Sequence, residues 1–418
     1  MNQFQINPFL SKTKTATLQI LTADEVQILA VLKNLKEALD TNRARIIEAN
    51  SMDLNKMDTS NPMRDRLLLN DSRIDALIQS IEDVMNLPDP SGKVLMKKTL
   101  ENGLKLSKIT VPLGVVGVIY ESRPNVTIDV AILSLRSRNG VILRGGTDAY
   151  ETNLFLVELI QQSLFQAGFS KDIVQLLPPD RNLFPEFLNA KKYIDIIIPR
   201  GSENLIQRVR EESSIPVIET GAGVCHTYIA ESADLGMALD IVENAKISRP
   251  SVCNALDTIL VDRKLAKEFL KELGPRFEKY QVEIFADQDS FSLLKDFQYP
   301  YLNHAQDDSF GKEYLDFACS IKILDHFDQA ILHIAEYSSK HSEAIISNDA
   351  LQAEQFLKMV DAAAVYWNAS TRFTDGGVFQ LGAEIGISTQ KLHARGPFAL
   401  EKLVTEKWVL RGNGQVRN

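Results

Sequence analysis

Cys253 is the residue whose type and setting most clearly suggest a chemical role. It lies in the segment Arg249-Pro-Ser-Val-Cys253-Asn254, where proline and serine interrupt regular structure, so the thiol is expected in a loop. Lys246 and Arg249 lie within seven residues of it and could lower the pKa of the thiol towards the reactive thiolate. A lone cysteine is more often a small buried core residue, so a structural role for Cys253 remains the alternative.

The other two cysteines are weaker candidates. Cys225 is followed by His226, which invites a cysteine–histidine dyad, but neighbours on a strand point to opposite faces. A cysteine hydrolase built on this pair would also need an orienting third group, and the sequence contains no matching signature. Cys319 lies at the start of an expected strand, and we predict that it is structural.

Two loops have the composition of phosphate-binding turns, namely Arg144-Gly145-Gly146 and Arg200-Gly201-Ser202. Each follows an apolar segment and precedes an expected helix, whose first N–H groups can bind phosphate. The arginines add a forked cation that suits a ribose 2′-phosphate. Neither loop has the Gly-x-Gly-x-x-Gly spacing of the usual dinucleotide fingerprint, so simple turn glycines remain an alternative.

A repeated alternation of strands and helices would position these candidates. From Pro112 onward, short apolar segments alternate with helical ones, which predicts a parallel sheet covered on both faces. After about residue 223 the same pattern restarts, which predicts a second α/β domain. Such sheets bind ligands beyond the carboxyl ends of their strands. The expected strands are 115–120, 141–143, 174–177, 194–198 and 216–218, then 258–261, 321–324, 344–347 and 363–367.

The segments that flank the first sheet predict helices and a hairpin. Helices are expected over 22–50, opened by a capping box of Thr22 and Glu25, and over 64–85. Asn102-Gly103 predicts a two-residue type I′ turn, because both residues tolerate positive φ. A long hairpin beside a nucleotide domain is more typical of assembly than of catalysis, and residues 401–409 are expected to form a closing strand.

Composition and charge exclude several classes of protein. A chain of 418 residues with 44% hydrophobic and 24% charged residues is typical of a globular protein of two domains. The net charge of −9 argues against a large nucleic-acid surface. No apolar run approaches the length of a membrane span, and the N-terminal segment lacks the pattern of a signal peptide. Three separated cysteines and six scattered histidines predict neither a disulfide framework nor a metal site, and they fit a reducing cytoplasm.

Five segments in order resemble the γ-glutamyl phosphate reductases, a family within the aldehyde dehydrogenase superfamily. The resemblance runs from about residue 20 to the C-terminus without large insertions, which makes it specific. The segments are Pro112-Leu-Gly-Val-Val-Gly-Val-Ile-Tyr-Glu-Ser-Arg-Pro-Asn125-Val-Thr, Val141-Ile-Leu-Arg-Gly-Gly146, Arg249-Pro-Ser-Val-Cys-Asn254, Asn368-Ala-Ser-Thr-Arg-Phe-Thr-Asp-Gly-Gly377 and Gln390-Lys-Leu-His-Ala-Arg-Gly-Pro397.

The resemblance implies a role for individual residues. Cys253 matches the nucleophile, and Asn125 matches the asparagine that stabilises the oxyanion. Arg144 matches the basic residue facing the adenosine ribose, and Ser202 matches the helix-start residue near the cofactor phosphates. Glu313 matches, more weakly, the glutamate that holds the nicotinamide ribose, and an exposed surface carboxylate is its alternative. The full set of expected cofactor contacts is Arg144, Gly145, Gly146, Arg200, Gly201, Ser202 and Glu313.

The same resemblance implies an aldehyde dehydrogenase-like α/β fold with two doubly wound parallel-sheet domains. We expect an NADP(H)-binding domain over 1–98 and 113–222, a catalytic domain over 223–395, and an oligomerisation hairpin and tail strand over 99–112 and 396–418. The hairpin and tail strand suggest a homodimer or homotetramer. The implied activity is NADPH-dependent reduction of L-glutamyl 5-phosphate to L-glutamate 5-semialdehyde and phosphate in proline biosynthesis. Functional coupling to glutamate 5-kinase is a further expectation; no metal, nucleic-acid or membrane partner is expected.

A substrate with a phosphate and a carboxylate needs cations in its pocket. The candidates lie mostly beside Pro, Gly, Ser or Thr in loops, where binding residues concentrate. Arg249 and Arg372 rank highest, and solvated surface arginines are the alternative. The full set is Arg123, Lys246, Arg249, Arg372, His393 and Arg395.

One segment departs from the hydrolytic members of the superfamily. Glu219-Thr-Gly-Ala222 resembles the Glu-Leu-Gly-Gly in which a glutamate activates water, but a reductase needs no deacylating water. We therefore expect that Glu219 is not essential for reduction. An ordinary aldehyde oxidiser of the same superfamily is the nearest rival, and a non-catalytic binding protein is a more distant one.

Overall fold

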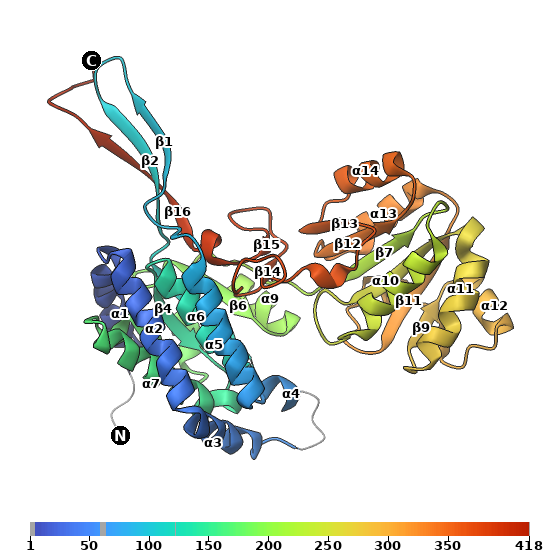
Figure 1. The fold of residues 1–418 in the computed structure, drawn as a ribbon, viewed down its shortest axis with the longest axis horizontal. Helices are drawn as coiled ribbons and strands as arrows, with labels where there is room; N and C mark the ends of the chain where they lie inside the picture. The colour runs from blue at the N-terminus through green and yellow to red at the C-terminus, as the bar shows by residue number, and fades with distance from the viewer. Residues whose placement is uncertain (1–4, 59–63, 122, 418) are drawn as a thin grey trace. The chain divides into compact units, whose positions relative to one another are not determined.

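The chain folds into two compact units, described here from a computed structural model that covers residues 5–58, 64–121 and 123–417. The first unit comprises Met1–Thr220, Gln380–Gly386 and Pro397–Asn418. The second comprises Gly221–Phe379 and Ile387–Gly396. Figure 1 shows helices and a sheet in each of them. None of the helices among these residues combines the length and apolar character needed to cross a bilayer.

A four-stranded parallel sheet forms the centre of the first unit, in the order β5-β4-β3-β6. Its strands are β3 (Val115–Tyr120), β4 (Gly140–Arg144), β5 (Val174–Leu176) and β6 (Ile196–Arg200). The expected strand at 216–218 pairs with β6 only through a single parallel bridge between Ile197 and Val217. The strands are buried apolar runs because helices cover both faces of the sheet.

Two sets of helices cover that sheet. On one face, α1 (Ile6–Leu21), α8 (Leu183–Leu188) and α9 (Glu203–Glu212) share an apolar cluster with β3, β4 and β6. On the other, α6 (Pro124–Arg136) and α7 (Tyr150–Gln166) pack against the strands. The remaining helices of the first unit are α2 (Glu25–Thr41), α3 (Arg43–Leu54), α4 (Arg64–Leu67) and α5 (Asp71–Asn86). An outer layer is formed by α2 and α5, which pack on α6.

The N-terminal helices differ from the expectation in three respects. Helix α1 was not expected, because three of its six buried side chains are threonine or alanine and the apolar periodicity is weak. The capping box of α2 consists of Asp24 and Gln27 rather than Thr22 and Glu25, since Thr22 ends α1. The two long helices expected over 22–50 and 64–85 are each divided, the first at Asn42 and the second before Asn70, which caps α5.

An antiparallel three-stranded sheet, in the order β1-β2-β16, also belongs to the first unit (Figure 1). It joins β1 (Val94–Thr99), β2 (Lys105–Pro112) and β16 (Val404–Arg411), so it begins before the expected boundary at residue 99. The β1–β2 turn has positive φ only at Gly103, and Gly103 N–H donates to the Leu100 carbonyl at 2.9 Å. It is therefore a three-residue loop rather than the expected type I′ turn.

A seven-stranded parallel sheet forms the second unit, in the order β10-β9-β11-β8-β7-β12-β13. Successive residues of β8 point to opposite faces: Ile259 and Val261 join one apolar cluster, and Leu260 joins the other. Helices α10, α11 and α12 cover the first face, and α13 and α14 cover the second. These α/β layers, together with those of the first unit, confirm the predicted fold class.

The bounds of the second unit extend the predicted pattern. The sequence did not predict β7, β9, β10 and α12, because these segments are short or polar and show no clear apolar periodicity. The strands are β7 (Cys225–Ile229), β8 (Leu256–Asp262), β9 (Glu283–Ala286), β10 (Leu302–His304), β11 (Ala318–Leu324), β12 (Ser342–Ile346) and β13 (Ala364–Trp367). The helices are α10 (Leu235–Ile247), α11 (Arg263–Glu278), α12 (Gln288–Asp296), α13 (Phe327–Tyr337) and α14 (Ala350–Met359). Short elements complete the chain, namely β14 (Ile387–Ser388), β15 (Gly396–Pro397) and the 3-10 turns η1 (Thr147–Ala149), η2 (Lys171–Ile173), η3 (Asp307–Gly311), η4 (Thr371–Phe373) and η5 (Leu400–Leu403).

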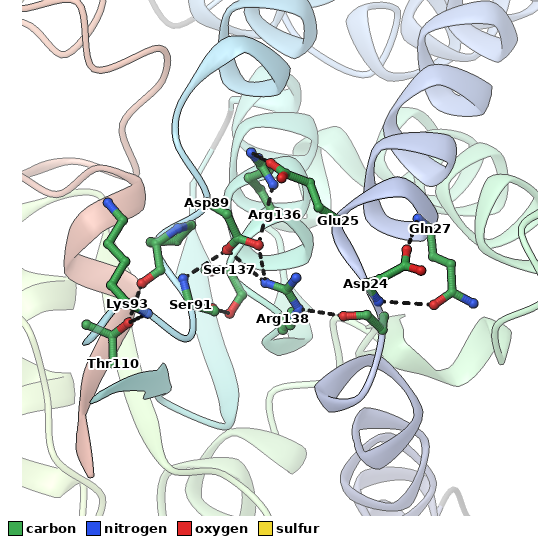
Figure 2. A network of polar contacts seen from close by, with 12 residues as sticks. Asp24, Glu25, Gln27, Asp89, Ser91, Lys93, Thr110, Arg136, Ser137 and Arg138 are labelled. Carbon is green, nitrogen blue, oxygen red and sulfur yellow. Dashed lines mark hydrogen bonds and ion pairs between the residues drawn. The ribbon is translucent and has the colours of Figure 1, made fainter. Parts of the chain in front are cut away.

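Two buried arginines tie the helices of the first unit to the start of the antiparallel sheet (Figure 2). The Arg136 guanidinium donates to Glu25 Oε1 at 2.5 Å and to the Leu87 carbonyl at 2.7 Å. Arg138 donates to the Ala23 carbonyl at 3.0 Å and to Asp89 at 2.8 Å. Asp89 also accepts the Ser91 N–H at 2.9 Å. The network thus joins the ends of α5 and α6 to the start of α2.

Replacing Asp89 by alanine is expected to destabilise the first unit. The change leaves the Arg138 guanidinium, whose side chain is only 10% exposed, without its carboxylate. Loss of one partner of a buried pair typically costs about 3 kcal/mol of unfolding free energy. Denaturant unfolding should show this loss, whereas Glu82→Ala, which breaks the exposed pair with Lys36, should cost below about 1 kcal/mol. Equal effects of the two substitutions would contradict the prediction.

Candidate active site

Cys253 lies in the loop between α10 and β8, as its neighbours predict, and its side chain is half-buried. Cys225 and Cys319 are fully buried, and none of the three forms a disulfide. Burial raises the pKa of the Cys225 thiol and raises the pKa of Cys319 to about 12. Cys253 is therefore the cysteine that a small molecule can reach most readily.

The backbone of Cys253 packs directly against Gly223. A Cβ atom on Gly223 would lie 1.6 Å from the Cys253 carbonyl oxygen, so only glycine fits there. The Cys225 thiol donates to the same carbonyl oxygen at 3.2 Å. On the other side, Gly223 N–H donates to Glu313 Oε1 at 2.9 Å, which places Glu313 beside the thiol loop.

Cys225 and His226 do not form a dyad. His226 Nδ1 faces Glu343 Oε2 at 3.1 Å, whereas the histidine near Cys225 Sγ is His341, at 3.9 Å. The two neighbours point to opposite faces of β7, as strand geometry requires. Both are fully buried, which argues against the cysteine hydrolase alternative.

Asn254 fastens the thiol loop to the 3-10 turn η4. Its amide Nδ2 donates to the carbonyls of Thr374 at 2.9 Å and Arg372 at 3.3 Å. The Thr371 hydroxyl donates to the Asn254 carbonyl at 2.8 Å. Arg372 Nε donates to Ser248 Oγ at 3.0 Å, and the same guanidinium contacts the Asn254 side chain. The buried contacts of Asn254 thus hold the loop and leave the neighbouring thiol half-exposed.

Arg372 and Arg249 are the expected substrate cations that lie near the thiol in the second unit. Burial and the charge of Arg249 lower the pKa of Arg372, while Asp375 and Cys253 oppose the shift. Two guanidinium groups that repel each other beside a half-exposed thiol are suited to an anionic ligand. Arg249 is exposed and Arg372 is half-buried, so both can be reached from solvent.

The other four expected substrate cations are placed differently. Lys246 is fully buried, donates to the Ala318 carbonyl at 2.7 Å and pairs with Asp257 at 3.7 Å, so its ammonium group already has partners inside the second unit. Arg395 pairs with Asp361 at 2.7 Å, and His393 is exposed. Arg123 lies in the first unit, at the N-cap of α6.

Arg144 ends β4 in the first unit and lies among other arginines. Its guanidinium is 4.6 Å from the centroid of the Phe184 ring, and that of Arg208 is 4.8 Å from the same centroid. Burial, then the charges of Arg208 and Arg181, lower the pKa of Arg144. Its Nε is buried without a hydrogen-bond partner. Arg208 also pairs with Glu212 at 2.8 Å on the surface of its helix. Two guanidinium groups over one ring, with a third cation whose charge acts on Arg144, fit an anion such as a phosphate.

Arg181 and Arg208 were missed because neither belongs to a recognisable motif. Arg208 lies within a helix whose exposed positions are rich in charge, and Arg181 lies in the loop after β5. Arg181 follows the end of a parallel strand and Arg208 lies on a helix next to the sheet. Ligands bind beyond the ends of such strands, so this placement could have indicated both residues. Only the tertiary structure brings the charges of both close enough to act on Arg144.

The second glycine loop already holds a carboxylate of the same unit. Ser202 caps α9 through its hydroxyl, and its N–H donates to Glu121 Oε2 at 2.8 Å. A Cβ on Gly201 would lie 2.5 Å from that oxygen. Arg200 contacts the Ile385 carbonyl, so its guanidinium points into its own unit. In the first glycine loop, Gly145 is closely packed as well, since a Cβ there would lie 2.4 Å from Asn153 Nδ2.

Asn125 and Glu219 complete the set of predicted residues, both in the first unit. Asn125 is half-buried in the first turn of α6, directly after Pro124. Its amide donates to Asp129 Oδ2 at 3.1 Å. Glu219 lies 3.4 Å from Arg210, on the strand-like segment beside β6. The predicted residues are therefore shared between the two units.

Replacing Gly223 by alanine is expected to displace the thiol loop. The added methyl group cannot share space with the Cys253 carbonyl, so the loop must move and the rate of thiol alkylation should change at least severalfold. Iodoacetamide labelling of the folded protein, followed by peptide mass analysis, measures this rate at Cys253. Gly236→Ala is a matched control, since its nearest neighbour would be 3.5 Å from the new Cβ. Unchanged alkylation in Gly223→Ala would contradict the prediction.

Comparisons with known proteins show which family this chain resembles. The sequence profile of the aldehyde dehydrogenase family matches residues 9–292. The gamma-glutamyl phosphate reductase of Chlorobium phaeobacteroides (strain BS1) is 50% identical over 409 residues, which cover 98% of each chain. The crystal structure of the gamma-glutamyl phosphate reductase from Thermotoga maritima superposes with a TM-score of 0.93 at 41% identity, covering 99% of this chain and 100% of that one. An engineered glycolyl-CoA reductase with bound NADP⁺ shares the fold, with a TM-score of 0.68 at 15% identity over 97% and 96% of the chains. The chain thus belongs to the aldehyde dehydrogenase family and, within it, to the gamma-glutamyl phosphate reductases.

Proposed function

We propose that the protein reduces L-glutamyl 5-phosphate to L-glutamate 5-semialdehyde and phosphate with NADPH, as a step of proline biosynthesis. The observation that carries the proposal is the 50% identity to a gamma-glutamyl phosphate reductase over 98% of both chains. The placement of Cys253 supports it, because this half-buried thiol lies on a loop beside Arg249 and Arg372. Both features suit an anionic acyl substrate.

The thiolate of Cys253 opens the reaction by attacking the acyl carbonyl carbon. A carbon–sulfur bond forms and the π electrons of the carbonyl move onto its oxygen, which gives a tetrahedral oxyanion. Collapse of this adduct restores the carbonyl as a thioester, and phosphate leaves with the electron pair of the carbon–oxygen bond. The oxyanion needs hydrogen-bond donors while it exists, and we assign the Cys253 N–H and the Asn125 amide to that role. Each such donor is worth roughly 3–4 kcal/mol in comparable enzymes. Arg249 and Arg372 would hold the phosphate and the carboxylate.

NADPH, when bound, supplies the hydride that reduces the thioester carbon to the aldehyde level. Collapse of the tetrahedral adduct breaks the carbon–sulfur bond, releases the aldehyde and returns the thiolate of Cys253. No water enters this sequence, so Glu219 need not act as a base. Its proximity to Arg210 is consistent with a structural role.

The first unit is proposed to hold the cofactor and the second unit the thiol. Arg144, Arg181 and Arg208 would bind the ribose 2′-phosphate, which gives a physical reason for NADPH over NADH. Among the other expected cofactor contacts, Gly145, Gly146, Gly201 and Ser202 remain proposals, and Glu313 would contact the nicotinamide ribose. Arg200 is the weakest of them, because its guanidinium contacts Ile385.

Assembly and location also remain proposals. The β1-β2-β16 sheet exposes apolar side chains that a second copy could cover in a homodimer or homotetramer. We place the enzyme in the cytoplasm, where its thiols stay reduced, and functional coupling to glutamate 5-kinase would protect a labile acyl phosphate. The exposed apolar side chains are Val94, Leu95, Met96, Trp408 and Leu410, each at least 44% exposed.

Cys253→Ala should abolish turnover, because no other described thiol replaces the nucleophile. The assay runs the reaction backwards, with glutamate semialdehyde, phosphate and NADP⁺, and follows the absorbance of NADPH. Cys319→Ala, which removes a fully buried thiol, should retain most of the activity. Substantial turnover by Cys253→Ala would refute the covalent route, and oxidation that does not depend on phosphate would favour an ordinary aldehyde oxidiser.

Arg208→Ala should weaken binding of 2′-phospho-ADP-ribose about tenfold and leave binding of ADP-ribose nearly unchanged. The reason is the loss of one charge-assisted contact to the phosphate. Isothermal titration measures both affinities without turnover. Lys33→Ala removes an exposed cation from α2 and serves as the charge-matched control. Equal weakening of both ligands by Arg208→Ala would remove Arg208 from the phosphate site.

A further inference from the structure

The first turns of α6 carry an asparagine and an aspartate on one face. Asn125 and Asp129 are four residues apart, a spacing that brings side chains together on a helix. Asn125 Nδ2 donates to Asp129 Oδ2 at 3.1 Å. The aspartate is part of no motif that we singled out in the sequence, and the reaction as described above does not use it.

Asp129 is held by groups from three elements of the first unit. Its second oxygen, Oδ1, accepts the Ser80 hydroxyl of α5 at 3.2 Å. Arg200, the last residue of β6, is the charged group whose field acts on it. Burial raises the pKa of Asp129 to about 6, while Asn125, Arg200 and Ser80 oppose the rise. Asp129 is half-buried, and with a pKa of about 6 its main form at neutral pH is the carboxylate.

A carboxylate determines which end of the Asn125 amide faces it. The oxygen and the NH₂ group of an asparagine have nearly the same shape, so packing alone hardly distinguishes the two orientations. An ionised carboxylate only accepts hydrogen bonds, so it pairs with the NH₂ group and excludes the flipped amide. One N–H is used in this contact, and the second N–H of the same nitrogen stays available for another acceptor.

We propose that Asp129 is a positioning residue, which fixes the Asn125 amide so that an N–H rather than the oxygen is presented to the oxyanion. This inference rests on the proposed function, in which Asn125 stabilises that oxyanion. A donor that is already oriented costs no reorganisation when charge develops, which is the source of its catalytic effect.

Arg200 completes the arrangement. A lone carboxylate near a developing oxyanion would oppose the reaction, because like charges repel. The positive charge of Arg200 lowers the pKa of Asp129 and offsets part of the negative charge of its carboxylate. The Arg200 guanidinium is itself held by a hydrogen bond to the Ile385 carbonyl. Because the Arg200 guanidinium points into its own unit, Arg200 is a weak candidate for a cofactor contact. The same direction lets its charge act on Asp129.

A double-mutant cycle tests the inference. Asp129→Ala should lower kcat about tenfold with little change in the KM for the semialdehyde, since loss of a whole oxyanion donor costs about 10²–10³ in kcat. In the Asn125→Ala background the same substitution should have almost no further effect, because its target is gone. Asp129→Asn, which can accept or donate, should give an intermediate kcat. Asp83→Ala removes an exposed carboxylate of α5 and is the control.

The pH profile gives a second readout. Protonation of Asp129 adds an O–H donor, so Asp129 no longer favours one orientation of the Asn125 amide. The wild-type kcat should therefore fall as the pH drops through about 6. That inflection should be absent from Asp129→Asn and from Asn125→Ala. If a different group caused the fall in kcat at low pH, the fall would be the same in the wild type, Asp129→Asn and Asn125→Ala, and the inference would be contradicted.

Three results would overturn the inference: equal losses from Asp129→Ala in both backgrounds, no loss in either, or full activity of Asn125→Ala. Equal losses would mean that Asp129 supports the fold instead, and a matching fall in melting temperature would identify that role. Failure of the proposed function is a separate outcome, since it would show as turnover that survives Cys253→Ala. The inference is supported if Asp129→Ala lowers kcat in the protein that retains Asn125 and not in Asn125→Ala.

Discussion

The close packing of Gly223 on the Cys253 peptide is the contact that fixes the path of the loop with the proposed nucleophile. A Cβ at position 223 would lie 1.6 Å from the Cys253 carbonyl oxygen, so the loop can adopt this path only beside a glycine. The same carbonyl accepts the Cys225 thiol, and Asn254 ties the next residue to η4. The loop is thus held through its backbone and its neighbours, and the Cys253 side chain is half-buried.

Positive charge is concentrated locally although the chain carries a net charge of −9. In the first unit, Arg144 and Arg208 lie over the Phe184 ring, and the charge of Arg181 also acts on Arg144. In the second unit, Arg249 acts on Arg372 beside the thiol loop. The neighbouring cations repel one another in each group, and a bound anion would relieve that repulsion. Lys246 differs because it is fully buried and paired with Asp257, whereas Arg208, which pairs with Glu212, is exposed.

Helix α6 illustrates how one short element serves both fold and site. Its last turn carries Arg136, which anchors the helix to α2 and to the end of α5 (Figure 2). Its first turn carries Asn125, hydrogen-bonded to Asp129. Rigid attachment at one end supports accurate placement of side chains at the other, because a helix transmits position along its axis with little bending.

The alternation of apolar strands and helices by itself determined the two α/β layers, since periodicity along the chain reports which faces are buried. It missed α1 and β7 because half of the buried side chains of α1 are threonine or alanine and β7 reads Cys-His-Thr-Tyr-Ile. Motifs likewise indicated Cys253, whose loop follows from local residue types. Only the tertiary structure decided that Lys246 is buried, that Arg200 turns inward, and that Arg181 and Arg208 approach Arg144. Those outcomes depend on contacts between residues far apart in the chain, and no local pattern encodes which distant group will lie beside a given side chain.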